Sequence, residues 1–325
     1  MSNVETVDQK AFMELLEAFE FNASLHNAKL VVKASSGQMD VWVYDNSAHN
    51  VTFQRGVSPD LLNYFDTYSP FNILNYISGE KEGRDVLSKE WREYFLTKAI
   101  YKYLVPDVDF LYRHYCSRLL ARFLGSNFKN LTFAVPRLTV FEIERRGKTV
   151  QDEEAGGLNR RLSIYAMDEI NFLKSNTNFV MLPSLDASLI SGFAEKADER
   201  STAMWIRKEI QEAMGRVKSK AVEFREDTVV FLTTDPINAF TVEVEGLTAY
   251  YFGKKVKNLK VIENVGHKQL FEIILDSSVV FGETRLDFLA GEVFKSYTVE
   301  EFSESQALPG PASNSIRMVE IESRR

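Results

Sequence analysis

The chain has 325 residues, of which 45% are hydrophobic and 26% are charged. This composition excludes global disorder, and the length is enough to bury a core without disulfides or bound metals. The formal net charge of −7 argues against a protein whose main partner is nucleic acid, because such binding relies on excess Lys and Arg. Cys116 is the only cysteine, which excludes an intramolecular disulfide and fits a buried thiol in a reducing compartment.

The sequence also lacks the patterns that are typical of targeting signals. The N-terminus lacks the cationic and apolar segments of a secretory signal, and no apolar run has the length of a membrane span. We therefore expect a cytoplasmic protein, or one assembled into a particle within the host cytoplasm, with no membrane partner.

The first elements along the chain are predicted to be a helix and a hairpin. Asp8 can cap an amphipathic helix that has one apolar stripe. Residues 30–45 have β-rich flanks around the Ser36-Gly37 pair, which favours a hairpin, and residues 51–55 favour a short strand.

Two helices are predicted next. The first covers about residues 88–105 and is stopped by Pro106. The second covers residues 107–124, with Asp107 as its N-terminal cap and Gly125 at its end.

The middle of the chain predicts a long hairpin. Residues 130–144 and 162–167 have strand-type sequence on either side of the polar stretch 145–161, which we interpret as a mobile tip. Residues 178–182 favour another strand, and residues 184–220 have the apolar period of a helix.

The C-terminal third is dominated by strand signals. From Thr228 to Val299 short apolar runs are cut by glycines, and Phe240, Val242 and Val244 alternate with polar residues at the period of a strand. Residues 300–325 are polar and rich in Ser and Pro, which predicts an extended tail without a packed core.

Together these elements predict an α+β fold. We expect largely antiparallel sheet, two helical segments at about 88–124 and 184–220, and an extended C-terminal tail. A parallel Rossmann-like order is not expected, because the predicted helices and strands do not alternate. The expected domains are 1–125, a hairpin plus a helical region; 126–299, a β-rich region with one long helix; and 300–325, the tail.

No motif in the sequence identifies an active site. The four histidines are far apart and no glycine-rich phosphate loop occurs, so no metal, cofactor or catalytic residue is predicted. His114 and Cys116 are two positions apart on a predicted helix and would point to different sides. Paired carboxylates could still form a hydrolase site in the fold, although solvation is the simpler interpretation. The candidates beside predicted strands are Asp227, Asp235, Glu243 and Glu245.

Two basic features predict contacts with an anion or with another subunit. One is a lysine strip on a predicted edge strand, where lysine also guards against edge-to-edge aggregation. The other is a set of arginines around the acidic hairpin tip, interpreted either as an assembly arm or as a solvated loop. The strip consists of Lys254, Lys255, Lys257 and Lys260, and the arm of Arg145, Arg146, Arg160 and Arg161.

The lack of site chemistry, with the polar tail and the long hairpin, favours a non-enzymatic, self-assembling structural subunit. A capsid or tail protein of a viral or phage virion is one example, and its partners would be further copies or other structural subunits. Two alternatives stay open. One is a hydrolase or nuclease-type enzyme whose residues converge only in the fold, and the other is a nucleic-acid-binding accessory protein that uses the lysine strip.

Overall fold

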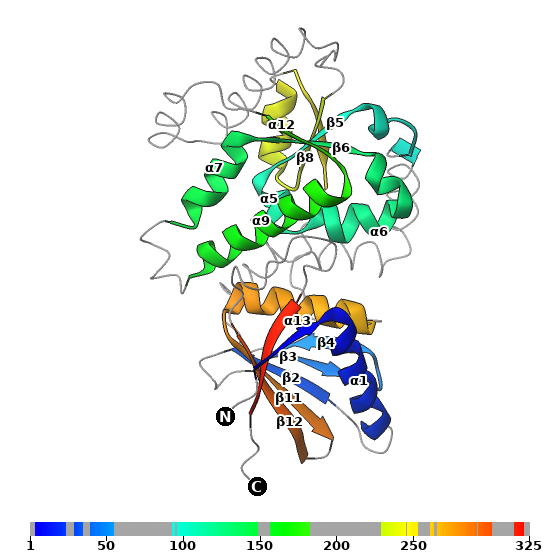
Figure 1. The fold of residues 1–325 in the computed structure, drawn as a ribbon, viewed down its shortest axis with the longest axis vertical. Helices are drawn as coiled ribbons and strands as arrows, with labels where there is room; N and C mark the ends of the chain where they lie inside the picture. Colours follow the sequence, from blue (N-terminus) through cyan, green and yellow to red (C-terminus); the bar gives the residue numbers. More distant parts are fainter. Residues whose placement is uncertain are drawn as a thin grey trace. The chain divides into compact units, whose positions relative to one another are not determined.

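The structure is a computed structural model, and it divides the chain into two compact units (Figure 1). Unit 1 comprises Met1–Glu80, Gly147–Asp168 and Lys255–Arg325, and unit 2 comprises Lys81–Arg146 and Glu169–Lys254. These units divide the chain differently from the consecutive domains predicted from the sequence. The residues described are 4–23, 29–34, 40–54, 93–94, 96–148, 157–182, 229–244, 246–252, 261–262, 265–290, 292–300 and 315–321.

The α+β class is confirmed, and unit 1 contains the antiparallel part of the fold. Its eight-stranded sheet has the order β1-β13-β12-β11-β2-β3-β4-β10, with antiparallel pairing throughout. The predicted hairpin is confirmed as β2 and β3. The elements are β1 (Val4–Asp8), α1 (Gln9–Ala23), β2 (Lys29–Ala34), β3 (Asp40–Asp45), β4 (Asn50–Phe53), β10 (Val261–Ile262), α13 (His267–Phe281), β11 (Thr284–Ala290), β12 (Glu292–Val299) and β13 (Ser315–Ile321).

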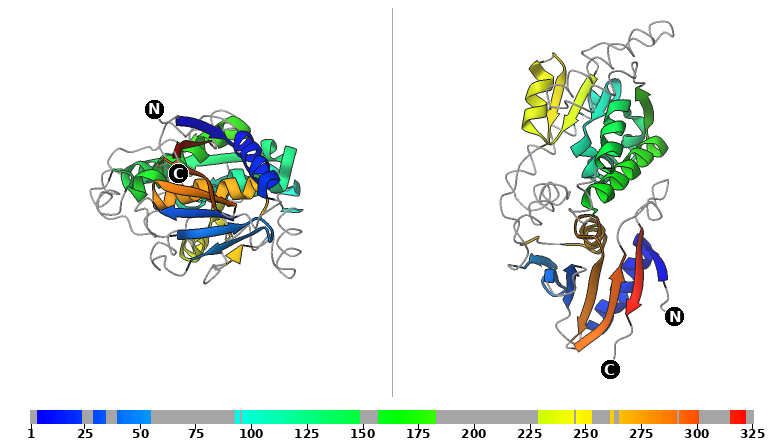
Figure 2. Two further views of the ribbon diagram at one scale, coloured as in Figure 1. Left: turned by 90° about the horizontal axis from the view of Figure 1, so that it is seen from below. Right: turned by 90° about the vertical axis from the view of Figure 1, so that its left-hand side faces the viewer.

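Helices α1 and α13 carry the core of unit 1 (Figure 2). The rings of Phe12 and Phe271 pack with centroids 5.4 Å apart, which joins the two helices. Trp42 of β3 donates its indole N–H to Ser277 Oγ of α13 at 2.9 Å, so the helix is also tied to the sheet. The sequence did not predict α13, because its residues lie in a block with strand-type composition.

Arg161 stabilises the C-terminal end of α13. Its Nε donates to the carbonyl oxygen of Val279 at 2.7 Å, where a helix has unpaired carbonyls and a partial negative charge. The helix ends at Gly282, with φ +80°, and a Cβ there would lie 3.5 Å from the guanidinium. Arg161 is buried, whereas Arg145, Arg146 and Arg160 are exposed, and an assembly role for those three stays a prediction.

Unit 2 contains a five-stranded parallel sheet, which contradicts the expectation that a Rossmann-like order is absent. Its order β7-β6-β5-β8-β9 is that of a doubly wound sheet. The elements are η1 (Ala99–Tyr101), β5 (Tyr103–Pro106), α5 (Val108–Tyr112), the π-helical turn η2 (Tyr115–Leu120), α6 (Ala121–Leu124), η3 (Gly125–Asn130), β6 (Thr132–Pro136), α7 (Arg137–Arg146), β7 (Asn178–Leu182), β8 (Val229–Thr233), α12 (Pro236–Val244) and β9 (Thr248–Tyr251). Helix α9 (Leu158–Asn176) belongs to unit 1 as far as Asp168 and to unit 2 from Glu169.

Several segments that were predicted to be strands are helices. Because of these errors, the sequence did not predict the alternation of helices and strands in unit 2. The predicted long hairpin is wrong, because residues 137–146 form α7 and residues 162–167 lie within α9. Both segments are rich in β-branched and aromatic residues, and packing overrides that local preference. Conversely, residues 103–106 form β5 although a helix was predicted there.

Helix α12 shows the reason for one of these errors. Phe240 and Val244 are exposed, whereas Val242 between them is buried. Positions two apart lie on one face of a strand but on nearly opposite sides of a helix, so the alternation was assigned to the wrong period. Figure 2 shows α12 (yellow) on one side of the parallel strands and α9 (green) on the other.

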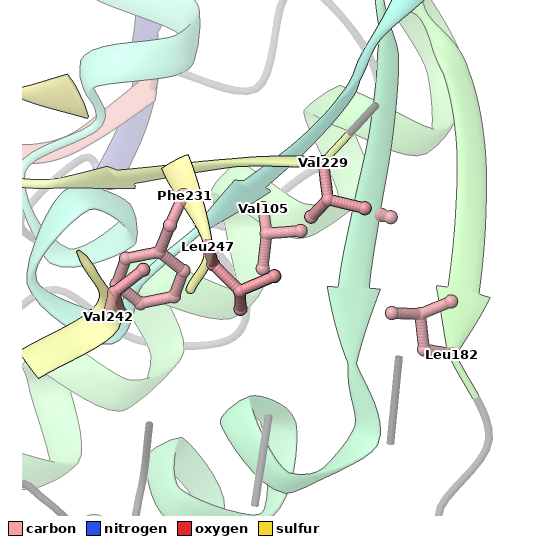
Figure 3. Close-up of a cluster of buried hydrophobic side chains, with 7 residues drawn as sticks. Val105, Leu182, Val229, Phe231, Val242 and Leu247 are labelled. Carbon is pink, nitrogen blue, oxygen red and sulfur yellow. The ribbon is translucent and has the colours of Figure 1, made fainter. Parts of the chain in front are cut away.

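A compact apolar cluster holds α12 against the parallel sheet (Figure 3). Val105 of β5 and Phe231 of β8 meet Val242 of α12 and Leu247 beyond it. Each such side chain contributes roughly 1.5–3 kcal/mol when it is fully buried. This packing fixes the segment that follows β8, on which the candidate site depends. The cluster comprises Val105, Ala134, Leu182, Val229, Phe231, Val242 and Leu247.

Other predictions concern segments only partly described. Residues 315–321 are extended, but they do not belong to the tail without a packed core that the sequence predicted: they pair on both sides as β13 with β1 and β12, and Met318 is buried. The predicted helix at 184–220 and the lysine strip at 254–260 lie outside the described residues. Within the described ranges, none of the helices combines the length and the apolar character needed to cross a membrane.

The contacts of Arg161 predict a clear difference between two neighbouring arginines. Arg161→Ala removes a charged donor from a buried carbonyl and should lower the free energy of unfolding by about 2–3 kcal/mol. Arg160→Ala, at an exposed position of the same helix, should change it by less than about 0.5 kcal/mol. Urea denaturation of the two variants measures both values, and equal effects would contradict this role for Arg161.

Candidate functional site

The carboxyl ends of β5 and β8 lie side by side at the centre of the parallel sheet. Pro106 pairs with Leu232 in the register of these strands. The chain leaves β5 toward β6 and β7, whereas β8 and β9 lie on the other side of β5. Ligands of open α/β sheets bind outside the carboxyl ends of strands at such a reversal of strand order.

Asp107 follows β5 directly and is fixed by three hydrogen bonds. Its backbone N–H donates to the carbonyl oxygen of Leu232 at 2.9 Å, which continues the pairing with β8. Its Oδ1 accepts from the N–H of Phe110 at 2.7 Å and caps α5, as the sequence predicted. Its Oδ2 accepts from the hydroxyl of Thr233, at the end of β8. The carboxyl group therefore has one defined position.

Burial dominates the electrostatics of Asp107. Loss of solvation raises the pKa of its carboxyl group from 3.8 to about 8, and the nearby charge of Asp109 adds to this shift. The hydrogen bonds from Thr233 and Phe110 and the charge of Arg113 oppose the shift without cancelling it. Near neutral pH, Asp107 thus holds a proton that a bound cation would displace.

Asp109 interacts electrostatically both with Asp107 and with a further carboxylate, Glu142. Asp109 lies in the first turn of α5, and its charge acts on Glu142 of α7. Burial raises the pKa of Glu142, Arg146 lowers it, and Asp109 raises it again. Arg146 donates to Glu142 Oε1 at 2.6 Å and also lies over the ring of Tyr112, so α5 and α7 are held together.

The loop after β8 adds a carboxylate and a hydroxyl. The N–H of Asp235 donates to Thr233 Oγ1 at 3.0 Å, so Asp235 is two hydrogen bonds away from Asp107. The carboxylate of Asp235 accepts from the N–H of Ile237 at 2.7 Å and begins α12. Between them, the buried hydroxyl of Thr234 has no hydrogen-bond partner among the described residues.

We call Asp107, Asp109, Glu142 and Asp235 the carboxylate edge. In the part of the chain that the structure describes, no three His, Cys, Asp or Glu side chains are placed to hold a metal ion together. Magnesium does not need such a cage, because it keeps several waters and binds through one or two carboxylates together with substrate phosphates.

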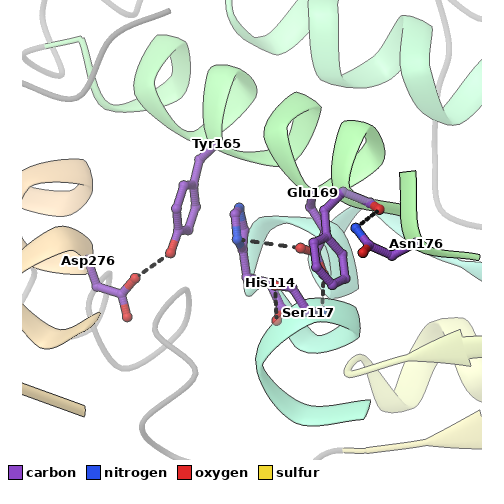
Figure 4. Close-up of polar contacts among 7 residues, drawn as sticks. His114, Ser117, Tyr165, Glu169, Asn176 and Asp276 are labelled. Carbon is purple, nitrogen blue, oxygen red and sulfur yellow. Dashed lines mark hydrogen bonds and ion pairs between the residues drawn. The ribbon is translucent and has the colours of Figure 1, made fainter. Parts of the chain in front are cut away.

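A second polar cluster in unit 2 is centred on His114 and Glu169, which are both buried (Figure 4). Glu169 of α9 accepts from the N–H of Ser117 at 2.8 Å, and its other oxygen lies 3.4 Å from His114 Nδ1. Burial raises the pKa of Glu169 to about 7. His114 has φ +52°, an uncommon conformation for its residue type, where α5 meets η2. These contacts fix the turn between the two helical elements.

Cys116 belongs to the same buried cluster. It is fully buried, as its apolar surroundings in the sequence predicted. Burial raises the pKa of its thiol well above the ordinary value, and the charge of Glu169 adds to this. A thiol in this setting stays protonated and is a poor nucleophile.

The sequence predicted four candidate carboxylates, and the structure describes two of them. Asp235 lies at the carboxylate edge, whereas Glu243 is exposed on α12 and faces solvent. Asp227 and Glu245 lie outside the described residues. Asp107, Asp109 and Glu142 were not considered as site residues. The signal that could have found Asp107 and Asp235 is their shared position directly after an apolar strand.

Comparisons with known proteins do not assign the chain. It matches no protein-family model, no curated protein and no solved structure.

The shifted pKa of Asp107 predicts a pH dependence of stability. The unfolded chain loses this proton near pH 4 and the folded protein near pH 8, so the free energy of unfolding falls as pH rises between these values. Asp107→Asn keeps a cap acceptor but cannot ionise. Relative to the wild type, this variant should gain about 4 kcal/mol between pH 5 and pH 8.

Urea denaturation at the two pH values measures this gain. Ser126→Ala, a substitution at an exposed position without a titrating group, should have the same free energy of unfolding as the wild type at both pH values. If Asp107→Asn also tracks the wild type, the carboxyl group does not hold its proton at neutral pH.

Proposed function

We propose that unit 2 is a divalent-cation-dependent phosphodiester hydrolase of the nuclease type. The observation that carries this proposal is the position of Asp107 and Asp235 after the neighbouring strands β5 and β8, at the reversal of strand order. They are linked by the hydroxyl of Thr233, which donates to Asp107 Oδ2 and accepts from the backbone N–H of Asp235. The proposal replaces the structural subunit as the leading hypothesis, because that hypothesis depended on a lack of site chemistry. A cytoplasmic location fits this proposal.

The chemistry follows from what carboxylates can do at such an edge. A cation held by Asp107 and a neighbouring carboxylate would bind a phosphate oxygen and a water molecule. The water oxygen forms a bond to phosphorus, the ester P–O bond breaks, and the leaving oxygen takes the proton that the water loses. The products are a phosphomonoester and an alcohol. No oxidant or further reactant is needed.

The distribution of charge removes an objection to a nucleic-acid substrate. Unit 2 has 23 Lys and Arg against 21 Asp and Glu, a net charge of +2, whereas unit 1 has 16 against 25, a net charge of −9. The net charge of −7 therefore comes from unit 1. Unit 2 does not repel a polyanion through its net charge.

Activity should depend on the cation and on the carboxylate edge. The wild type should cleave a phosphodiester with Mg²⁺ or Mn²⁺ and lose this activity in EDTA. Asp107→Asn and Asp235→Asn should each lower kcat/KM at least about 100-fold, because each removes a charge that holds the cation. Hydrolysis of bis(p-nitrophenyl) phosphate, followed by absorbance, measures these rates.

Glu243→Gln is the matched control, since this carboxylate is exposed on α12 and lies outside the carboxylate edge. It should keep wild-type activity. Equal losses in Glu243→Gln and Asp107→Asn, or cleavage that persists in EDTA, would contradict the proposal.

We also propose self-assembly as a second candidate function, which retains the structural-subunit hypothesis. The observation that favours it is an apolar stripe on the solvent side of α12, formed by Ile237, Phe240 and Val244, which are 56%, 67% and 64% exposed. Apolar side chains at helical spacing that stay exposed together are typical of an interface. A second copy of the chain would cover this stripe.

The stripe on α12 predicts a change in mass on substitution. The wild type should form dimers or larger assemblies, and Phe240→Ser should shift the protein to monomer by removing the largest apolar contact. Thr241→Ala on the same helix serves as the control and should leave the mass unchanged. Light scattering after size exclusion, over a hundredfold range of concentration, provides the measurement. A wild type that is monomeric throughout would exclude self-assembly.

A further inference from the structure

Tyr251 lies at the carboxylate edge and presents an aromatic ring to solvent. It ends β9 and pairs with Thr233, the last residue of β8, in the register of the sheet. Its side chain is 38% exposed. Burial raises the pKa of its hydroxyl, the charge of Asp235 adds to the shift, and Arg113 opposes it. The ring therefore lies within electrostatic reach of the proposed site.

The neighbours of Tyr251 along the chain fix its backbone. Tyr250 packs against Tyr94 with ring centroids 4.4 Å apart. Phe252 packs edge-on against Phe110 at 5.0 Å, and its N–H donates to the carbonyl oxygen of Thr233 at 2.8 Å. Both flanking rings are used in packing, whereas the ring of Tyr251 keeps part of its surface in water. An aromatic ring on such an anchored strand is a preformed surface for stacking.

Arg113 adds a cation next to the carboxylates. Its Nη1 donates to the hydroxyl of Tyr115 at 3.3 Å, and the guanidinium lies 5.7 Å from the centroid of that ring. Its charge acts on Asp107 and Asp109 as well as on Tyr251. The buried Nε has no hydrogen-bond partner among the described residues. A guanidinium whose charge acts on both the carboxylates and Tyr251 is the type of cation that pairs with a phosphate oxygen.

We propose that Tyr251 is the specificity-determining residue of the hydrolase, on which the base next to the scissile phosphate stacks. The inference rests on the proposed function, because the ring selects a nucleotide only if the phosphate is bound at the carboxylate edge. A base can offer its face to a protein ring only when it is unstacked from its neighbours. Tyr251 therefore selects unpaired nucleotides and discriminates against a duplex.

Binding of a labelled 12-nucleotide single strand tests this role. Fluorescence anisotropy with Ca²⁺ in place of Mg²⁺ measures the Kd of the full chain without turnover. Tyr251→Ala should raise this Kd about tenfold, the order expected for loss of one stacked base. Tyr251→Phe keeps the ring and should stay within about twofold of the wild type. Tyr101→Ala removes a tyrosine of unit 2 that is 76% exposed, and should have no effect.

Two further arms separate failure of this inference from failure of the proposed function. Hydrolysis of bis(p-nitrophenyl) phosphate by the wild type tests the proposed function separately, and urea denaturation of Tyr251→Ala shows whether the variant is folded. A duplex of the same sequence should bind at least about tenfold more weakly than the single strand.

The outcomes are distinct. If the small ester is cleaved but Tyr251→Ala binds the single strand as the wild type does, or the duplex binds equally well, the role of Tyr251 is wrong and the hydrolase stands. If neither bis(p-nitrophenyl) phosphate nor the 12-nucleotide single strand is cleaved with any divalent cation, the hydrolase and the role of Tyr251 fail together.

Discussion

A buried carboxyl group at the end of a central strand is the constraint on which the proposed site depends. Asp107 is held at once by its own helix, through the N–H of Phe110, and by the adjacent strand, through the hydroxyl of Thr233. Removing a carboxylate from water is costly unless it is neutralised or paired. Here the cost is met by holding a proton, which under the proposed function a cation would displace.

The parallel sheet brings Asp107 next to a hydrogen-bond partner from a distant part of the chain. Asp107 and Thr233 are 126 positions apart in the chain, and they meet because β5 and β8 are neighbours. The cluster of Val105, Phe231 and Val242 holds β5, β8 and α12 together, so the loop carrying Asp235 begins from a fixed frame. A site placed on rigid elements in this way is more closely defined than one placed on free loops.

The sequence predicted local features better than long-range ones. Asp107 as a helix cap, Cys116 as a buried thiol, the hairpin β2–β3 and the strand at residues 178–182 depend on residues near one another, and each is confirmed. The segments assigned to the wrong period, such as α12, have β-branched and aromatic residues whose preference is overruled by packing in three dimensions.

The site itself could be predicted only in part for the same reason. Asp235 was considered because it follows an apolar run, but nothing near it in sequence indicates Asp107 as its partner. That pairing depends on strand order, which cannot be derived once α7 and α9 are taken for strands. The sequence alone therefore predicts one member of the carboxylate edge, Asp235, but not the group as a whole.

Titration of the full chain with Mn²⁺ by calorimetry at pH 7 tests the central claim most directly. The account predicts saturable binding of Mn²⁺, accompanied by release of a proton from Asp107, which appears as a dependence of the heat on the ionisation enthalpy of the buffer. Asp107→Asn should abolish both the binding and the proton release. Absence of saturable binding in the wild type, or binding that Asp107→Asn leaves unchanged, would contradict it.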